Sequence, residues 1–431
     1  MDYQQAVNYL DSLQVHKIKL GLEAINSLLA RLGNPHLALK FIHVAGTNGK
    51  GSVCAAMAAI LQEAGYQPGL YTSPHLYEVR ERFRVGRKYI SKDDFAEVIS
   101  RIAFELGDEK ITYFECLTAA AFLWFAEIKP DLVILETGLG GRLDATNVVM
   151  PLISIITNIS MDHEAYLGYT LKDVAAEKAG IIKPQVLVIT GCRGESLTVI
   201  KKAAREKKAE VLVIDQDFSA AGQGRGFAYL PKNSAKALPL NMVCGLEGEH
   251  QPENISLAVT AAFLLEKQGY KIKKEHILSG IKNLHWPGRQ EHIKVQSGGR
   301  QVAYFLDGGH NPAGIASLQK SLQNRYNDKK LYLIWAAMVD KDGQQTLPKL
   351  APLMEKIYLP RMETERSAEP EKIAENLTGR ERQKCVITDD VRQAMLTAEQ
   401  HLPENGLIVA AGSLYLVGMV RFLLLGSLLD S

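Results

Sequence analysis

Short apolar runs rich in β-branched residues alternate along the chain with longer segments that have the periodicity of amphipathic helices. In the first part of the chain these runs cover residues 40–45, 132–135, 152–156 and 186–189. Strands that are apolar at nearly every position are typical of a parallel sheet whose two faces are both covered by helices. The alternation therefore predicts an α/β fold with a mainly parallel sheet.

A second alternating series follows the segment Trp286-Pro-Gly-Arg289, with apolar runs at residues 302–306, 331–334, 386–388 and 407–410. Between the two series, from residue 219 to residue 240, the periodicity gives way to Gly, Ser, Lys and Pro, which predicts an exposed excursion. A chain of 431 residues is too long for a single core. We therefore expect two domains, residues 1–287 and a smaller one at residues 288–431.

The last apolar stretch, residues 406–426, is long enough to suggest a membrane span. Gly412 and Ser413 interrupt it, however, and Arg421 would lie in hydrocarbon at a cost of about 3 kcal/mol. We therefore expect a short buried strand followed by a core helix that begins at Ser413. Another helix is predicted to start at Ser91, because a capping hydroxyl there precedes carboxylates in the first turn.

Composition and charge narrow the class of protein. Lys and Arg number 50 against 48 Asp and Glu, and this near balance argues against a nucleic-acid partner. The five cysteines are scattered without C-x-x-C spacing, which argues against both a disulfide framework and a zinc site. The first residues show no secretion signal. We expect a cytoplasmic monomer with neither a membrane nor a nucleic-acid partner.

The strongest chemical signal is the segment Ile42-His-Val-Ala-Gly-Thr-Asn-Gly-Lys-Gly-Ser52, an apolar run, a Gly-rich turn and the start of a helical pattern. Backbone N–H groups of such a turn and the helix N-terminus form an anion cradle, and Lys50 adds a positive charge for a terminal phosphate. The general phosphate-loop pattern has its hydroxyl directly after the lysine, whereas Gly51 intervenes here before Ser52. A Gly-rich connection without a nucleotide is the alternative interpretation.

Glu136 ends another apolar run and begins the segment Glu136-Thr-Gly-Leu-Gly-Gly-Arg-Leu-Asp-Ala-Thr-Asn147. The position predicts a carboxylate at the same sheet edge as the phosphate loop, where a hard oxygen ligand suits Mg²⁺. A carboxylate that caps the following turn is the alternative.

Four more titratable residues lie in or just beyond strand-end segments. His163 follows the run 152–156 and is either a metal ligand or a satisfied loop histidine. Lys178 lies among small residues, where it is either a solvated side chain or an amine whose pKa is lowered enough for reaction with CO₂. Asp307 and His310, in Asp307-Gly-Gly-His-Asn-Pro312, are either site residues or members of a tight loop.

These five motifs, in this order, resemble the folylpolyglutamate synthase and dihydrofolate synthase family, within the Mur-type ATP-dependent amide ligases. The most specific segments are Gly46-Thr-Asn-Gly-Lys-Gly-Ser52 and residues 136–147, and the resemblance extends to Gly412-Ser-Leu-Tyr-Leu-Val-Gly418. It implies a phosphate-loop (P-loop) N-terminal α/β domain with a mainly parallel sheet and a smaller Rossmann-like α/β C-terminal domain.

The resemblance also implies a role for individual residues. The implied ATP contacts are Thr47, Asn48, Gly49, Lys50, Gly51, Ser52, Asn254, Arg289, Asp307 and His310. Ser73, Glu136 and His163 are implied as ligands of two Mg²⁺ ions, and Lys178 as a carbamylated lysine that organises the second ion. The implied contacts of the folate or dihydropteroate are Phe114, Glu115, His75 and Arg82.

The chemistry implied is amide formation at a carboxylate that is unreactive at neutral pH. ATP would convert the carboxylate of the pteroate or folate to an acyl phosphate, which the amine of L-glutamate would attack. Lys50, Lys178 and His163 are the implied catalytic residues, because phosphoryl transfer depends on positioning and charge neutralisation. Dihydropteroate, reduced folates or both remain open as acceptors.

The sequence departs from the family pattern at two places: Arg80 replaces Asn in Asn-Glu-Arg, and Gly309 replaces Ala in Asp-Gly-Ala-His-Asn-Pro. Arg80 lies in the loop that the resemblance places at the folate. Two other functions remain as alternatives, a Mur-type ligase for a nucleotide-linked peptide and an ATP-driven switch protein that ligates nothing.

Overall fold

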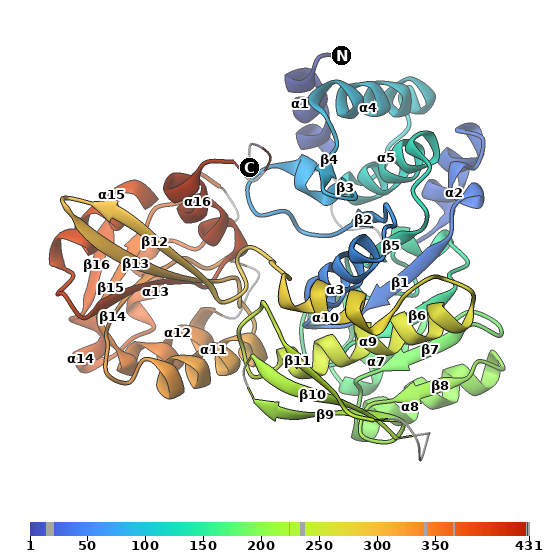
Figure 1. Ribbon diagram of the computed structural model, residues 1–431. Helices are drawn as coiled ribbons and strands as arrows, with labels where there is room; N and C mark the ends of the chain where they lie inside the picture. The colour runs from blue at the N-terminus through green and yellow to red at the C-terminus, as the bar shows by residue number, and fades with distance from the viewer. Residues whose placement is uncertain are drawn as a thin grey trace. The chain divides into compact units, whose positions relative to one another are not determined.

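The computed structural model describes residues 1–13, 21–223, 225–232, 238–339, 343–364, 367–427 and 429. The chain forms two compact units (Figure 1). The first comprises Met1–Pro74, Val79–Gly245 and Gln251–Leu284, and the second comprises His75–Glu78, Leu246–His250 and His285–Ser431.

The first unit is built on an eight-stranded sheet in the order β4-β3-β2-β5-β1-β6-β7-β8. Its strands from β2 to β8 in that order are parallel, and β3 and β4 extend the sheet as antiparallel edge strands. The strands are β1 (Phe41–Ala45), β2 (Gly69–Tyr71), β3 (Phe83–Val85), β4 (Lys88–Tyr89), β5 (Val133–Glu136), β6 (Ile153–Ile156), β7 (Leu187–Thr190) and β8 (Val211–Val213). The four strands predicted from apolar runs, β1, β5, β6 and β7, lie within one residue of their expected bounds.

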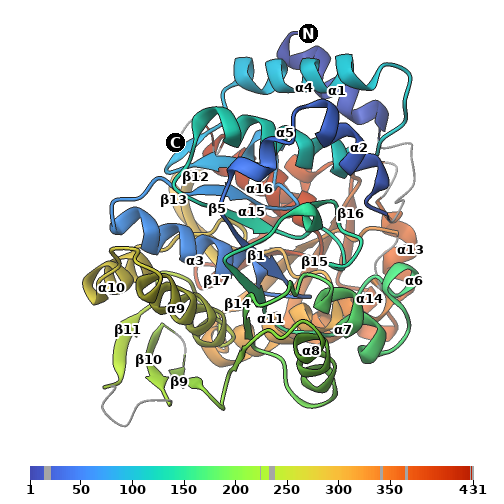
Figure 2. The ribbon, with the colours of Figure 1, turned by 90° about the vertical axis from the view of Figure 1, so that its right-hand side faces the viewer.

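Helices cover both faces of this sheet (Figure 2). They are α1 (Tyr3–Leu13), α2 (Glu23–Arg31), α3 (Lys50–Glu63), α4 (Lys92–Leu106), α5 (Tyr113–Ile128), α6 (Glu164–Leu167), α7 (Leu171–Ala179), α8 (Gly194–Glu206), α9 (Gln251–Lys267) and α10 (Lys274–Lys282). Phe41, Val133 and Leu135 share one hydrophobic core with α5, whereas α3 packs on β1 and β5 from the opposite face. As predicted, Ser91 caps α4, where its hydroxyl accepts a hydrogen bond from the Asp94 amide.

The sequence predicts an exposed excursion without regular structure at residues 219–240. The described residues of this region instead form a three-stranded antiparallel sheet. Its strands are β9 (Phe218–Gln223), β10 (Gly226–Pro231) and β11 (Leu240–Val243). Phe227 and Tyr229 are buried and alternate along β10 with an exposed Gly226 and the half-buried Ala228 and Leu230. The Tyr229 hydroxyl lies 3.1 Å from the Thr260 hydroxyl on α9. The apolar residues are too few and too widely spaced to dominate the Gly, Ser and Lys that surround them in the sequence.

The second unit contains a six-stranded sheet in the order β12-β13-β17-β14-β15-β16, parallel except for β12. Its strands are β12 (Glu291–Ser297), β13 (Arg300–Asp307), β14 (Lys330–Trp335), β15 (Met354–Pro360), β16 (Cys385–Thr388) and β17 (Gly406–Ala411). Its helices are α11 (Pro312–Arg325), α12 (Gly343–Leu350), α13 (Pro370–Glu375), α14 (Gly379–Arg382), α15 (Val391–His401) and α16 (Leu414–Leu425). Phe305 and Leu333 pack with α11 and α12 on one face, and Leu306 and Ile334 pack with α15 and α16 on the other. This is the smaller α/β unit that the second alternating series predicts.

The apolar stretch 406–426 forms β17 and α16, as predicted, and the Ser413 hydroxyl caps the helix. Arg421 is buried on α16 beside Glu291, at 3.1 Å. Across the described ranges, none of the helices is both long and apolar enough to cross a membrane.

Candidate active site

The loop between β1 and α3 can form only with glycine at two positions. Gly46 and Gly49 have φ angles of +151° and +84°. A Cβ atom at Gly49 would lie 2.3 Å from Asn254 Oδ1 on α9, and one at Gly46 would lie 1.8 Å from Thr157 Oγ1. The loop therefore approaches α9 and the end of β6 more closely than any side chain permits. This contact also brings Asn254, an expected nucleotide contact, to the loop.

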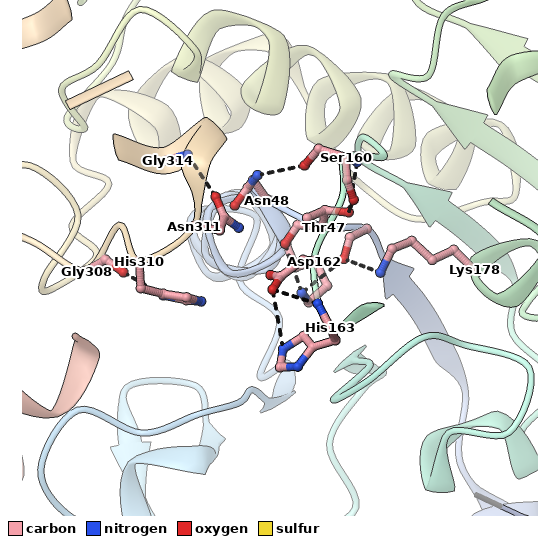
Figure 3. A network of polar contacts seen from close by, with 12 residues as sticks. Thr47, Asn48, Ser160, Asp162, His163, Lys178, Gly308, His310, Asn311 and Gly314 are labelled. Carbon is pink, nitrogen blue, oxygen red and sulfur yellow. Dashed lines mark hydrogen bonds and ion pairs between the residues drawn. The ribbon is translucent and has the colours of Figure 1, made fainter. Parts of the chain in front are cut away.

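Hydrogen bonds fix the loop to the segment that follows β6 (Figure 3). Thr47 donates its amide to Asn158 O at 2.8 Å and its hydroxyl to Ser160 O at 3.0 Å. The Asn48 amide donates to Asn158 Oδ1 at 2.9 Å, and the Thr157 hydroxyl donates to Asn48 O at 2.6 Å. The sequence prediction missed Asn158 and Ser160 as supporting residues. Their position directly after a strand at the phosphate-loop edge was the available signal.

Two lysines donate to the same backbone carbonyl in this loop. Lys50 Nζ lies 3.1 Å and Lys178 Nζ 3.0 Å from Gly46 O. Lys178 is only 4% exposed. Burial, followed by the nearby charge of Lys50, lowers the pKa of Lys178 to about 7, although Asp162 and Asp144 act in the opposite direction. The structure thus gives Lys178 a buried position and a substantial neutral fraction near neutral pH, unlike a solvated surface lysine.

His163 lies close to this group of residues, on the loop that leads into α6. Its amide donates to Asp162 Oδ1 at 2.9 Å, and its imidazole Nε2 lies 3.8 Å from the same oxygen (Figure 3). His163 has a left-handed backbone, with φ of +52°. Asp162, which was not among the predicted site residues, therefore connects the imidazole to the charge environment of Lys178.

Glu136 and Ser73 meet at the ends of the neighbouring strands β5 and β2. The Ser73 amide donates to Glu136 Oε2 at 3.2 Å, and Glu136 is 4% exposed. The Glu136 carboxylate therefore accepts a hydrogen bond from a segment that is distant in the sequence. Capping of the following turn is thus not its sole contact. Among the described residues, no three His, Cys, Asp or Glu side chains gather as a metal cluster.

A buried polar network supports the segment after Glu136. Asp144 accepts from the Leu139 amide at 2.7 Å and from the Thr146 hydroxyl at 2.5 Å, and His43 Nε2 lies 2.8 Å from that hydroxyl. Burial raises the pKa of Asp144 against the effect of these hydrogen bonds, and burial with a contribution from Lys183 lowers the pKa of His43 to about 3. The network fixes the segment that runs from Glu136 towards α7 and Lys178.

Three expected acceptor contacts lie in the first unit. The Phe114 ring covers Gly138, where an added Cβ would lie 2.5 Å from the ring. Glu115 is part of a capping box at the start of α5, with Thr112. The buried Arg82 guanidinium lies 5.6 Å from the centroid of the Tyr113 ring. The fourth expected contact, His75, belongs to the second unit and lies against Tyr415 with ring centroids 6.4 Å apart.

Arg80, which departs from the family pattern, packs against the N-terminal helix. Its guanidinium lies 5.3 Å from the centroid of the Tyr3 ring, and NH1 donates to Ile90 O at 3.2 Å. The arginine at this position is thus explained by its packing on Tyr3 of α1.

The second unit brings Arg289, Asp307 and His310 together at the end of β13. Asp307 Oδ1 accepts from the Gly309 amide at 2.7 Å, and His310 Nδ1 lies 2.9 Å from Gly308 O (Figure 3). An added Cβ at Gly308 would lie 3.3 Å from the Arg289 guanidinium. Burial raises the pKa of Asp307, and the charge of Arg289 opposes that rise.

A phosphate loop on a parallel sheet, together with a second α/β unit, is the architecture that the resemblance to Mur-type ligases implies. Comparison with protein families agrees with this assignment. The Mur ligase middle domain matches residues 44–262, and the glutamate ligase domain of Mur ligases matches residues 288–414.

Within that class the chain belongs to the folylpolyglutamate synthase and dihydrofolate synthase family. It is 33% identical to the dihydrofolate synthase/folylpolyglutamate synthase of Bacillus subtilis, over 97% of this chain and 98% of the relative. A crystal structure of folylpolyglutamate synthase from Thermotoga maritima is 36% identical, with a TM-score of 0.82 over 99% of this chain and 97% of that one. FolC of Escherichia coli in complex with DHPP and ADP is 29% identical, with a TM-score of 0.86 over 98% of this chain and 97% of that one.

Proposed function

We propose that this chain is an ATP-dependent ligase that joins L-glutamate to the carboxylate of a pteroate or folate. The observation that carries the proposal is the phosphate loop, in which Lys50 and Lys178 both donate to Gly46 O. Family membership supplies the substrate class, since the relatives named above are dihydrofolate or folylpolyglutamate synthases. We place the enzyme in the cytoplasm as a monomer, and its five free cysteines are consistent with a reducing compartment.

In the proposed reaction, a carboxylate oxygen of the acceptor attacks the γ-phosphorus of ATP, and ADP leaves. The glutamate amine then attacks the acyl carbonyl, phosphate leaves, and the nitrogen loses a proton. The loop amides and Lys50 would hold and neutralise the transferring phosphoryl group. The hydrogen bonds from residues 157–160 fix the loop before ATP binds, which reduces the cost of ordering it.

The residues at the sheet edge have the donor atoms that Mg²⁺ prefers. The Ser73 hydroxyl and the Glu136 carboxylate supply hard oxygens at neighbouring strand ends, and we propose that they hold one ion. His163 is the proposed ligand of a second ion. When bound, Mg²⁺ neutralises charge on the β- and γ-phosphates.

We propose that Lys178 is carbamylated. Carbamylation joins the neutral amine to CO₂ and releases a proton, so it requires an amine that is neutral at working pH. Burial of Lys178 and its lowered pKa of about 7 meet that requirement. The carbamate would replace a cation that repels Mg²⁺ with an anion that can orient the ion or its ligands.

Phe114, Glu115, Arg82 and His75 are the proposed acceptor contacts. Phe114 offers an aromatic face beside Gly138 at the sheet edge that carries Glu136. Arg82 supplies a buried positive charge suited to an acidic substrate.

The deciding experiment measures phosphate release from ATP with and without L-glutamate, using dihydropteroate and tetrahydrofolate as acceptors in parallel. We expect release to require both glutamate and an acceptor, and the faster acceptor identifies the synthase activity. Release without glutamate would indicate an ATP switch protein. Release only with a nucleotide-linked peptide would indicate the other Mur-type activity.

A further inference from the structure

The turn that carries Arg289 has an unusual backbone. Gly288 and Gln290, on either side of Arg289, have φ angles of +71° and +48°. A non-glycine residue in the left-handed region costs about 1 kcal/mol, so it persists where surrounding contacts determine it. The turn is therefore held in shape by its neighbours.

Two side chains anchor the turn. Gln290 is 3% exposed and donates from Nε2 to the Ser321 hydroxyl on α11 at 3.0 Å. Glu291 reaches back along the turn and accepts from the Gly288 amide at 2.8 Å. The Gly288 carbonyl in turn accepts from the Gly308 amide at 2.8 Å, which connects the turn to the end of β13 and Asp307.

Glu291 is itself held by a buried ion pair. Arg421 Nε on α16 lies 3.1 Å from Oε1 and 3.2 Å from Oε2 of Glu291, and their side chains are 9% and 7% exposed. His285 approaches the same carboxylate at 3.4 Å. Burial alone would raise the pKa of Glu291, but the hydrogen bond from His285 and the charge of Arg421 bring it below its usual value.

A buried ion pair is weak evidence for stability, because an apolar pair of similar volume often serves the fold equally well. An apolar pair would, however, not replace the Glu291 carboxylate oxygen that accepts the hydrogen bond from the Gly288 amide. The charge of this pair is therefore better explained by the shape of the turn than by the stability of the unit.

We propose that Glu291 and Arg421 are positioning residues for Arg289. Together with Gln290 they hold residues 288–291 so that the Arg289 guanidinium remains beside Asp307. The proposal rests on the proposed function only in giving Arg289 a nucleotide to contact. In this role neither Glu291 nor Arg421 touches a reacting atom.

The test compares the full-length parent with an apolar-pair variant, Glu291→Leu combined with Arg421→Met. Glu399→Gln is the matched control, because Glu399 accepts from the hydroxyls of Tyr304 and Ser297 in the same unit but does not contact the turn. We expect the apolar pair to lower kcat/KM for ATP about tenfold, mainly through KM, while the urea midpoint stays close to that of the control. In an Arg289→Ala background, the apolar pair should lower kcat/KM for ATP by less than about a further twofold, because both changes remove the same contact.

A second readout does not depend on catalysis. Trp286 lies two residues before the turn and is partly exposed, whereas Trp124 and Trp335 are 4% and 1% exposed, so acrylamide quenching reports mainly on Trp286. The apolar pair should increase this quenching, and Glu399→Gln should not. Unchanged quenching, or losses that multiply fully with Arg289→Ala, would overturn the proposal. If the parent shows no glutamate-dependent ADP formation, the proposed function fails and the quenching comparison alone decides the positioning role.

Discussion

Lys50 and Lys178 share one acceptor, the carbonyl of Gly46, but their environments differ. Lys50 begins α3 and is partly exposed, whereas Lys178 is buried on α7. The sequence could predict the role of Lys50, since a lysine in a Gly-rich loop after a strand has few other uses. It could not decide the role of Lys178, because the buried Lys178 amine donates to Gly46 O on a segment 132 residues away in the sequence.

We predict that Lys50→Ala abolishes glutamate-dependent phosphate release without unfolding the protein. The Lys50 amine donates to the loop carbonyls of Gly46 and Thr47 at 3.1 and 3.4 Å rather than packing in the core, so its removal leaves the core intact. Its charge is needed on the phosphoryl group. Phosphate release and circular dichroism measured on the same sample check this. Near-wild-type turnover in a folded variant would refute the ligase assignment.

Lys178 also predicts a dependence of stability on pH. Its pKa is about 7 in the folded chain against 10.5 for the unperturbed amine. Between these values the unfolded chain binds a proton that the folded chain does not, so stability rises with pH, by up to about 1.4 kcal/mol per unit. Below pH 7 both states are protonated, and the full cost of burying the cation is present. Lys178→Met should flatten the rise between pH 7.5 and 9, as measured by urea unfolding in CO₂-depleted buffer.

The matched control for that experiment is Lys172→Met, which removes an exposed lysine paired with Glu195. It should keep the slope of the parent. Equal slopes in the two variants would show that Lys178 is solvated in solution.

Carbamylation makes a separate prediction about the same residue. Lys178→Ala should lose most activity and regain part of it with added short-chain carboxylates, because these place a negative charge in the vacated space. Activity titrations with acetate and formate, with chloride as the control salt, measure this. A crystal grown with nucleotide, Mg²⁺ and bicarbonate that shows an unmodified amine would argue against the carbamate.

At the scale of elements, Glu115 at the start of α5 has both a structural role and a proposed role as a substrate contact. Glu115 Oε2 accepts from both the amide and the hydroxyl of Thr112 in the capping box. Glutamine also serves in such a box, so Glu115→Gln should leave the free energy of unfolding nearly unchanged, whereas Glu115→Ala should lower it by about 1 kcal/mol.

The same two variants separate capping from binding. If Glu115 contacts the acceptor, Glu115→Gln raises the acceptor KM without changing the KM for ATP. Asp173→Asn is the control, since Asp173 occupies the equivalent position in the capping box of α7. An acceptor KM equal to that of the parent would leave Glu115 with the capping role alone.

Elements differed in how well their sequences predicted them. The buried parallel strands β1, β5, β6 and β7 were predictable because each is a short run that is apolar throughout. The edge strands β3 and β4 were not, because they have only three and two residues, most of these are at least partly exposed, and they include Arg84 and Lys88. The sheet β9-β10-β11 was missed for a related reason, since α9 buries Tyr229 through a contact 31 residues away.

At the scale of the whole molecule, the predicted site residues divide between two units. Lys50, Glu136 and Lys178 belong to the first, whereas Arg289, Asp307 and His310 belong to the second. Sequence motifs could assign residues to strand ends within each unit, because the carboxyl ends of parallel strands share one edge. They could not show the contacts that shape the turn of Arg289, because Glu291 and Arg421 are 130 residues apart and neither lies in a recognisable motif.

This division leads to a prediction about the second unit. If Arg289 contacts the nucleotide, Arg289→Ala removes a charge-assisted hydrogen bond to a phosphate and should lower kcat/KM for ATP about 10- to 100-fold. Arg300→Ala is the matched control, because Arg300 belongs to the same sheet but donates to backbone carbonyls at the end of α15. Steady-state kinetics over a range of ATP concentrations, with isothermal titration of ADP, measure the effect. An Arg289→Ala variant with the kinetics of the control would show that this arginine makes no contact with the nucleotide, and Asp307→Asn would then be the next variant to test in the second unit.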